Sequence, residues 1–570
     1  MVQQNEEKST PFYDVVIIGA GISGLFSATL LSKAGLSVCV LEKNAHPGGY
    51  LTGYKRFDYR FDTAIHWLNQ CGPDGMVTKF FDLIGKDHPV SFPQKSIRNY
   101  IKDTTNYLLT NNPDELKNQL IKEYPREKKG IEKFFATAKK LGDIMNSSQK
   151  FFFFRAIETM GFFEKIFCLL NRLKFALSFI KYINYSGTKG VTRGLNKFFK
   201  DKKLHALFPF EPDLLSCLIP VGWAYKGDFQ NPPKGGSQAF PEWLSYVVNF
   251  YENDIRYSAK VNRILVEKGN CKGVSYEYRG EEYKIHCEQV IAACDVSTLY
   301  EKMLPQEVVP PKMIEKLRNS DIYTSALLVS VALDCLSENL GFNEESVFIS
   351  KDNVNRGNLN TGDPENSEIT VVAPSVRDKS LAPKGCGTLI IHIPALFENN
   401  HRWKTIEDEN GMIVRGEAYK KLKKEYADIL IRRVEERIAP GLREHIVHYD
   451  VATPITYWRY TGNRDGSMMG AKPGKKNIIA GIAHYKTAVK GLYLGGHWAE
   501  LGGGVPMAVR AATNTALLVL KQRKHKAFKV YVDYFELKKT LEETLSSNII
   551  KHYDNSWVQT LTPAQKRENA

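Results

Sequence analysis

The chain has 570 residues, of which 43% are apolar and 11% aromatic, which excludes a disordered protein and predicts two or three packed domains. Its formal net charge of +15 favours anionic partners such as acidic lipid or phosphorylated cofactors. The nine cysteines are scattered, without a C-x-x-C pair or metal-type spacing, so we expect a reducing, cytoplasmic setting and no metal site. We find no apolar run of 18 uncharged residues and no secretory segment, so we expect neither a membrane span nor a signal peptide.

Residues 14–49 have the pattern of a buried strand, a glycine-rich turn, a helix and a second strand. Gly19, Gly21 and Gly24 have G-x-G-x-x-G spacing, which suits a tight turn, the approach of a pyrophosphate and close packing of helix on strand. Glu42 ends the second strand, where a carboxylate can accept hydrogen bonds from ribose hydroxyls. These features in register predict a dinucleotide site at the N-terminus of the helix.

The residues directly after Glu42 bear on the choice between NAD and FAD. Pro47, Gly48 and Gly49 come almost at once, and FDYRFDTAIHWL then supplies an extended segment interrupted by turns. A second glycine doublet directly after the first βαβ unit is typical of a group of flavoproteins and favours FAD.

Residues 151–203 combine aromatic and basic side chains. Helical spacing links a set of large apolar residues: Phe163, Ile166, Phe167, Leu170, Leu173, Leu177 and Ile180. The segment has eleven basic and three acidic residues, a composition that suits a helix lying on an anionic membrane surface. The alternative is a helical cap whose apolar face lines the core or a substrate tunnel. The aromatic residues share a face with Leu and Ile, so we expect no nucleic acid.

The middle of the chain alternates between the two predicted domains. PPKGGSQ at 232–238 precedes a predicted helix from Phe240 to Tyr251, and VIAACD at 290–295 has the pattern of another central strand. Residues 320–396 contain the β-rich runs SALLVSVAL, ITVVAP and GTLIIHI, which predict a separate sheet. Residues 417–437 are charged and helical, as expected of a solvated cover.

A strand, a glycine loop and a helix are predicted over residues 491–512, GLYLGGHWAELGGGVPMAVRAA. Gly502, Gly503 and Gly504 would let backbone amides approach a flavin ring. The dipole of the helix after these glycines would favour negative charge on the reduced ring. A flexible surface loop is the alternative.

Four segments together resemble the phytoene-desaturase-like flavoproteins, which include bacterial-type phytoene desaturases, carotenoid isomerases and retinol saturases. They are the N-terminal motif through PGG, FDTAIHWL, PPKGGSQAFPEWLSYVV, and TPITYWRYTGNRDGSMMG with the C-terminal glycines. Ala64 stands where these proteins often have glycine, and His497 with Trp498 where many have an acidic residue and a small one. These departures leave the direction of the reaction and the contacts to the ring open.

The resemblance implies an α/β protein with a discontinuous Rossmann-type FAD-binding domain and a mixed α+β substrate domain, and the composition of residues 151–203 adds a helical, membrane-facing cap. We expect the FAD-binding domain in three parts, 13–90, 232–300 and 453–525. The helical cap and substrate region would span 91–231, the substrate-domain sheet and helix 301–452, and a C-terminal helical tail 526–570.

The resemblance also implies which residues form the site. Cofactor contacts are expected from Gly19, Gly21, Gly24, Glu42, Lys43, Gly49, Val261, Gly496, Gly503, Gly504 and Val505, with Val261 contacting the adenine through its backbone. His66, His497 and Glu500 should border the flavin, and each is a candidate catalytic residue for proton exchange. Each also has a structural interpretation: a packed histidine, a donor that positions the flavin, and a neighbour of a helix N-cap.

These features predict an FAD-dependent oxidoreductase that desaturates, saturates or isomerises C–C double bonds of a long isoprenoid or polyene lipid by flavin hydride transfer. The alternatives are an oxidoreductase acting on a fatty acyl chain or an amine, and a non-catalytic flavin-containing lipid-binding protein. The electron partner stays open between oxygen, quinone and NAD(P)H. We expect a cytoplasmic protein that associates peripherally with membranes.

Overall fold

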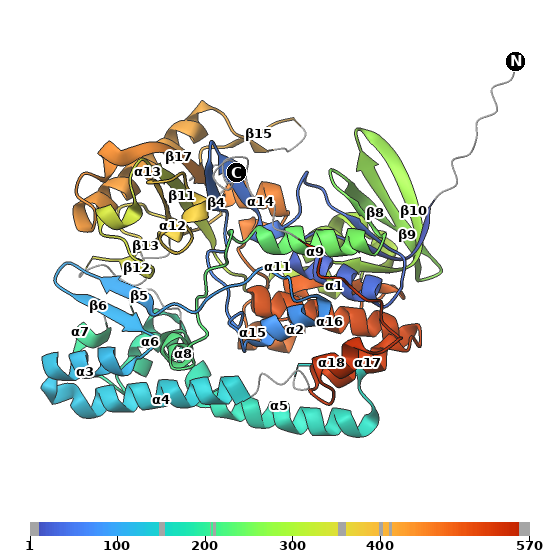
Figure 1. Cartoon of the computed structure of the whole chain (residues 1–570), viewed down its shortest axis with the longest axis horizontal. Coiled ribbons are helices and arrows are strands. Elements are labelled where there is room, and N and C mark those ends of the chain that lie inside the picture. The colour runs from blue at the N-terminus through green and yellow to red at the C-terminus, as the bar shows by residue number, and fades with distance from the viewer. Residues whose placement is uncertain are drawn as a thin grey trace, which may run out of the picture.

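The computed structural model describes residues 11–147, 154–205, 207–208, 213–351, 361–397, 403–409 and 413–557. They form two large sheets set side by side, with helices packed between and around them (Figure 1). Residues 151–153 of the basic segment and residues 558–570 of the expected C-terminal tail lie outside the described part of the chain.

The first sheet contains the predicted βαβ unit. Its strands are arranged in the order β7-β2-β1-β10-β9-β8, and β18 pairs with β10. Their bounds are β1 Phe12–Ile18, β2 Val38–Leu41, β7 Asp254–Arg256, β8 Lys260–Glu267, β9 Asn270–Tyr278, β10 Glu281–Ala292 and β18 Leu492–Leu494. Strands β7, β2, β1, β10 and β18 run parallel, whereas β8, β9 and the first half of β10 form an antiparallel meander. The apolar run Val15–Ile18 is buried, as expected for a central parallel strand.

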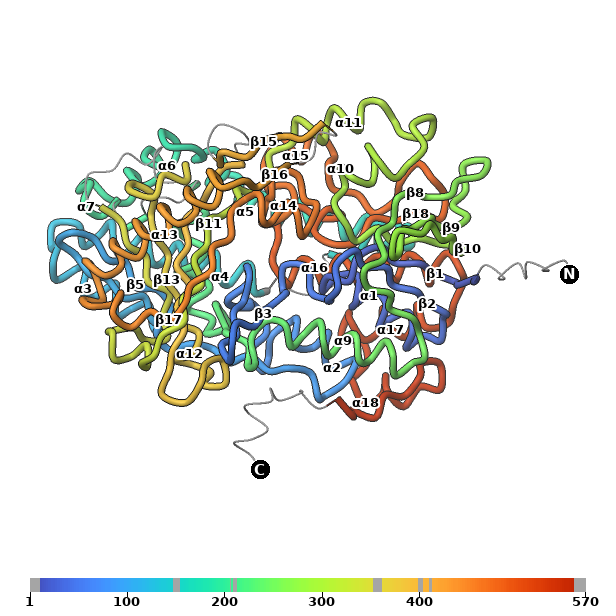
Figure 2. Tube along the Cα trace, turned by 90° about the horizontal axis from the view of Figure 1, so that it is seen from above, coloured from blue at the N-terminus to red at the C-terminus, as the bar shows by residue number. Residues whose placement is uncertain are grey.

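Two helices from opposite ends of the sequence cover this sheet together. Helix α1 (Ile22–Lys33) packs against α16 (Val505–Gln522), and α9 (Ala239–Phe250) lies on another side of α1 (Figures 1 and 2). The Ser23 hydroxyl donates to the Ala508 carbonyl at 2.8 Å, so the first turns of α1 and α16 touch. The predicted helices after Gly504 and near 240–251 are confirmed.

The second sheet has the order β17-β11-β14-β13-β12-β5-β6. Its strands are β5 Ser96–Ile101, β6 Asn106–Thr110, β11 Ser325–Leu333, β12 Ser346–Ile349, β13 Ile369–Val372, β14 Gly387–Ala395 and β17 Ile446–Ala452. The β-rich runs predicted within 320–396 are confirmed as β11, β13 and β14. Helix α13 (Glu417–Arg437) packs apolar residues on one face, so it is more than a solvated cover. The hairpin of β3 (Gly53–Arg56) and β4 (Tyr59–Asp62) packs on the face of the second sheet opposite to α13.

The region predicted as mostly helical opens with β5 and β6, which pair as an antiparallel hairpin, and NYLLT of β6 alternates in burial as a strand does. The helices after them are α3 Asp114–Glu123, α4 Lys128–Ser147, α5 Phe162–Ile183, α6 Gly187–Leu195, α7 Lys202–His205 and α8 Leu214–Ala224. Helices α4 and α5 lie end to end along the lower edge of the molecule in Figure 1. The predicted amphipathic helix is confirmed as α5, and α8 packs against it.

Eight shorter helices complete the described part of the fold. They are α2 Met76–Ile84, α10 Val296–Thr298, α11 Pro311–Arg318, α12 Pro374–Arg377, α14 Pro454–Thr461, α15 Lys475–Ala480, α17 Ala527–Phe535 and α18 Leu541–Leu545. Helices α2 and α17 pack on α16, whereas α12 and α14 pack on strands of the second sheet. The Tyr531 hydroxyl of α17 donates to the Leu30 carbonyl at 2.8 Å. Among the described helices, none combines the length and apolar character needed to cross a bilayer.

Candidate functional site

The N-terminal glycines occupy positions where a side chain would collide with backbone. A Cβ on Gly24 would lie 2.0 Å from the Gly19 carbonyl oxygen, so only glycine lets α1 pack this closely on the turn. Gly19 itself has φ +103° and faces the Ala293 carbonyl oxygen, which a Cβ would approach to 2.8 Å. The first and third glycines are therefore required by the turn and by packing.

Gly21 differs because the space beside it is open. The nearest atom to a Cβ built there is the Gly49 Cα at 4.0 Å, and Gly21 and Gly48 form a parallel bridge. Helix α1 starts directly after Gly21 with no side-chain cap and no acidic residue in its first turn. Bare backbone at an uncapped helix N-terminus is suited to a phosphate group.

The glycines near the C-terminal end of the chain lie beside the N-terminus of α1 as well. The Gly495 amide donates to the Ala292 carbonyl at 2.8 Å, and Gly496 lies beside Ser23 of α1. Gly504 has φ +84° and begins α16, whose first turn also has no side-chain cap and no acidic residue. A Cβ on Gly503 would come within 2.3 Å of the Met469 sulfur. Two uncapped helix N-termini thus converge on one region.

The expected adenosine side of the site is also well ordered. Glu42 is buried, and its carboxylate accepts hydrogen bonds of 2.8 Å from the Ala20 amide and from both nitrogens of Asn44. The Ala259 amide donates to the Glu42 carbonyl at 2.8 Å, which brings β8, with Val261, beside the end of β2. Lys43 donates to the Arg459 carbonyl at 3.2 Å, and burial of its ammonium group lowers its pKa.

The GGSQ segment ties the Gly48–Gly49 doublet to the FDTAIHWL segment. Ser237 donates to Asp62 from its amide and its hydroxyl, both at 2.8 Å, and Gln238 bonds the backbone of Gly53 and of Pro47. Burial raises the pKa of Asp62 to about 6. Sequence reasoning did not single out Asp62, although its place in the FDTAIHWL segment was the available signal.

His497 and Glu500 both have partners in the folded chain. The His497 Nε2 lies 3.4 Å from the Asn463 side-chain amide, and burial lowers the His497 pKa to about 4. Glu500 forms a 2.5 Å ion pair with Arg510 and accepts a hydrogen bond from the Tyr485 hydroxyl. The Glu500–Arg510 ion pair holds the loop before α16 against that helix, and the His497 contact joins the same loop to Asn463.

His66 has a different environment. It is 8% exposed, and its Nδ1 is buried without a hydrogen-bond partner among the described residues. Its ring centroid lies 5.8 Å from that of His392 on β14, whose Nε2 is likewise buried without a described partner. Burial, reinforced by the neighbouring ring, lowers the pKa of His66 to about 3, and burial lowers that of His392 to about 4. Sequence reasoning missed His392 because nothing in GTLIIHI shows which element its side chain would face.

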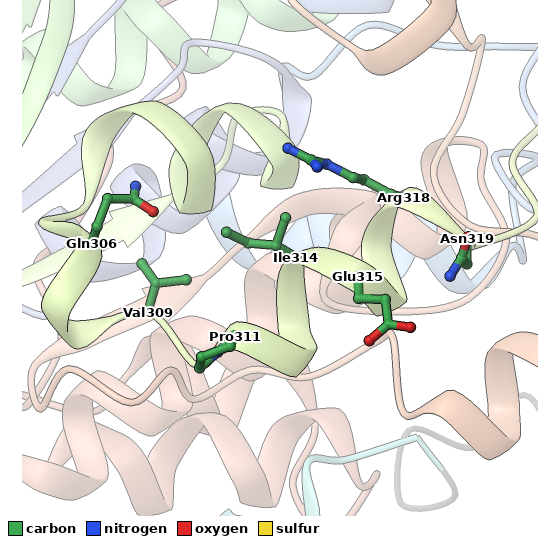
Figure 3. Close-up of a pocket in the computed structure, with 7 residues that line it drawn as sticks. All are labelled: Gln306, Val309, Pro311, Ile314, Glu315, Arg318 and Asn319. Atoms are coloured by element: carbon green, nitrogen blue, oxygen red, sulfur yellow. The ribbon is translucent and has the colours of Figure 1, made fainter.

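Two other features of the molecule lie apart from the glycine-rich region. Asp334, Cys335 and His445 place ligand atoms within 4.8 Å of one another, but Asp334 is exposed and already bonds His445 at 2.9 Å. A hollow on the surface beside α11 is lined by Gln306, Val309, Pro311, Ile314, Glu315, Arg318 and Asn319 (Figure 3). Neither feature shares a residue with the predicted site, so neither belongs to it.

Comparison with known proteins agrees with this geometry. A family model described as an NAD(P)-binding Rossmann-like domain matches residues 17–83. Prolycopene isomerase of Daucus carota is 28% identical, over 86% of this chain and 77% of that protein. The all-trans-retinol 13,14-reductase of Danio rerio is 26% identical, over 90% of this chain and 86% of that protein. The predicted resemblance to the phytoene-desaturase-like flavoproteins is thereby confirmed.

The fold of the chain is also found outside these relatives. A solved variant of putrescine oxidase superimposes with a TM-score of 0.57 at 14% identity, over 90% of this chain and 100% of that one. At this identity the likeness concerns the fold alone: a Rossmann-like dinucleotide-binding domain joined to a mixed substrate sheet.

Proposed function

We propose that this chain is an FAD-dependent oxidoreductase that desaturates, saturates or isomerises C–C double bonds of a long isoprenoid or polyene lipid. The relatives named above support a carotenoid- or retinoid-modifying oxidoreductase, whereas the amine oxidase likeness rests on fold alone. The proposal therefore favours a polyene over an amine or a fatty acyl chain.

The observation that carries the proposal is the meeting of two uncapped helix N-termini, α1 after Gly21 and α16 after Gly504. A Rossmann unit that binds a dinucleotide needs only the first. A second helix N-terminus beside it, reached through glycines with no side chain in the way, suits a group that develops negative charge beyond the phosphates. FAD fits this pair, and when bound it accepts or donates a hydride.

The site residues then have three expected roles: contact with the cofactor, shaping of the backbone around it, and contact with the substrate. Gly21 and Gly49 would let the pyrophosphate approach the backbone. Glu42 would accept hydrogen bonds from the ribose, Val261 would contact the adenine through its backbone, and Lys43 would lie beside them. Gly19, Gly24, Gly496, Gly503, Gly504 and Val505 would shape the backbone around the cofactor. Of the three candidate catalytic residues, His497 and Glu500 are engaged by the chain itself, so His66 is the one we assign to contact with the substrate.

The test is to purify the protein, supply FAD, and record the visible spectrum before and after adding a panel of polyenes without oxygen. We expect a flavin spectrum that changes with at least one polyene, together with a product whose mass shifts by two hydrogens or whose absorbance shifts at constant mass. A protein that stays colourless would overturn the assignment. A bound flavin that never changes redox state, with every polyene unaltered, would support a lipid-binding role instead.

We also infer that α5 is the part of the chain that docks on an anionic membrane. Ten large apolar side chains of this helix are exposed: Phe162, Phe163, Ile166, Phe167, Leu169, Leu170, Leu173, Leu177, Ile180 and Ile183. Only Cys168 and Phe179 of the helix are buried. The apolar face therefore does not line the core, which was the alternative interpretation. Exposed apolar faces of this extent mark interaction surfaces.

The charges around α5 favour lipid over a second copy of the chain. Lys174 and Lys181 are exposed on the helix, and exposed lysines and arginines continue through α6 and α7. The only acidic residue of α5, Glu164, is paired with Arg155 at 2.5 Å. An apolar face framed by basic residues attracts acidic headgroups, at about 1 kcal/mol per basic residue near the surface, but repels another copy of itself.

Substitutions on α5 test this docking better than deletion, because Arg155 before it is buried in an ion pair with Glu536. We expect Leu170→Glu with Leu177→Glu to abolish flotation with phosphatidylserine vesicles while the flavin spectrum is kept. Lys420→Glu, on an exposed face of α13, is the matched control and should float normally. Unchanged flotation of the double variant, or a dimer in light scattering that the substitutions dissolve, would overturn the lipid assignment.

A further inference from the structure

His66 and His392 form a buried pair where the segment after the β3–β4 hairpin meets the second sheet. His66 comes shortly after β4 of the hairpin, and His392 lies in the middle of β14 in the second sheet. Each buries one ring nitrogen with no described hydrogen-bond partner. Leaving a buried polar atom unpaired costs about 1–3 kcal/mol, so folded proteins rarely keep two such atoms side by side. A partner from outside the chain would remove the cost.

The surroundings of the pair do not supply that partner. On β14, His392 shares its face with Ile390, and it stands opposite Leu328 of β11 in the strand register. The hairpin contributes Tyr59 and Phe61 to the same apolar cluster. The Tyr59 hydroxyl is already engaged, since it donates to the Leu333 carbonyl at 2.9 Å. The two imidazoles are therefore set beside an apolar cluster at the contact between the β3–β4 hairpin and the second sheet.

The chemistry of two neutral imidazoles selects the kind of group that fits between them. A neutral imidazole has one N–H donor and one acceptor nitrogen. Their ring centroids are 5.8 Å apart and the rings are tilted by 35°, so the pair is close enough for one oxygen atom at the edge of both rings to bond a nitrogen of each. A hydroxyl can accept from one ring and donate to the other. A carbonyl can only accept, so it satisfies the pair only when both rings donate, whereas a hydroxyl also fits when one ring accepts. A hydrocarbon neither accepts nor donates.

We propose that His66 and His392 form a subsite for the hydroxyl group of an otherwise apolar isoprenoid alcohol. This rests on the proposed function and narrows its substrate class from any polyene to an alcohol. The pair binds the polar end of the substrate and thereby fixes which double bond lies at the reacting position. His392 is then a specificity-determining residue, and His66 contacts the hydroxyl rather than a reacting carbon.

The test compares the binding of a polyene alcohol with that of the same polyene lacking the hydroxyl, using the FAD-loaded full chain and ligand fluorescence or absorbance. We expect the unaltered protein to bind the alcohol at least about 10-fold more tightly, because a site built for a hydroxyl leaves its own polar groups unpaired when the group is missing. His392→Phe should bring the two affinities to within about threefold by weakening alcohol binding alone. His392→Gln, which keeps a donor and an acceptor, should retain part of the preference.

Ile390→Val provides the matched control, since it alters packing on the same face of β14 without touching a polar atom. It should change both affinities by the same factor. An equal preference for the alcohol in His392→Phe and the unaltered protein would overturn the proposal, as would equal binding of both ligands before any substitution. If a hydrocarbon polyene still reacts in that case, the proposed function stands. If neither ligand binds, the proposed function fails as well.

Discussion

Helices α5 and α16 have similarly apolar sequences but opposite environments. Fourteen of the eighteen residues of α16 are buried, including Thr513, Asn514 and Thr515, whereas α5 exposes ten large apolar side chains. Helix α16 is enclosed by α1, α2 and α17, while α5 packs chiefly against α8. The apolar sequence of a helix predicts that it has an apolar face. Whether that face is buried within the chain depends on which neighbouring elements pack against it.

The largest effect is expected where α1 meets the turn and α16. Gly24→Ala would place a Cβ 2.0 Å from the Gly19 carbonyl oxygen, so backbone must move. We expect the free energy of unfolding to fall by more than about 3 kcal/mol and flavin binding to be lost. Flavin absorbance and thermal unfolding measure both. Gly416→Ala, a position with open space around it, is the control and should bind flavin normally.

Removing a single side chain from the enclosed helix should have the next largest effect. Leu517 of α16 is 0% exposed, and Leu517→Ala would leave a cavity among its neighbours. We expect a loss of about 2–5 kcal/mol in the free energy of unfolding, measured by urea denaturation. A loss below about 1 kcal/mol would mean that α16 is less tightly enclosed than the structure shows.

The enclosed part of the molecule also includes neutral histidines, which makes its stability depend on pH. The folded pKa of His392 is about 4, below its usual 6.5, so between these values the unfolded chain binds more protons. Its contribution therefore raises stability as pH increases from 4 to 6.5, by up to about 1.4 kcal/mol per pH unit. His392→Phe should flatten the plot of unfolding free energy against pH in this window. An unchanged slope would show that the ring is accessible to protons in the folded state.

The smallest effect on stability is expected on the exposed helix. Leu170 of α5 is 61% exposed, so Leu170→Ala should change the free energy of unfolding by less than about 0.5 kcal/mol. The same variant should bind phosphatidylserine vesicles more weakly, by roughly 10-fold, because it removes apolar area that the lipid would cover. A destabilisation close to that of Leu517→Ala would contradict the contrast between the two helices.

Much of the fold could be predicted because its signals are local. Strand, glycine turn and helix succeed one another within residues 14–35, and α5, α13 and α16 each have helical periodicity in their own sequence. The strands β5 and β6 were missed at the start of the helical region, since short runs such as NYLLT are ambiguous until they pair.

The candidate site also contains residues that local sequence predicts and residues that it does not. Its glycines could be named in advance because glycine motifs have few other uses, and the structure places Gly21 beside Gly49 and Gly496 beside Ser23. Asp62 and His392 could not be found in the same way. Their importance lies in contacts to Ser237 and to His66, which come from segments far away in the sequence.

The sequence by itself determined where the backbone must be bare and which segments become helices or strands, because glycine geometry and apolar periodicity act over a few residues. Only the tertiary structure decided that α16 is enclosed while α5 is left open, that Glu500 is engaged by Arg510, and that His66 faces His392. These outcomes depend on which distant surfaces pack together, and burial and pairing are properties of that packing rather than of any single segment.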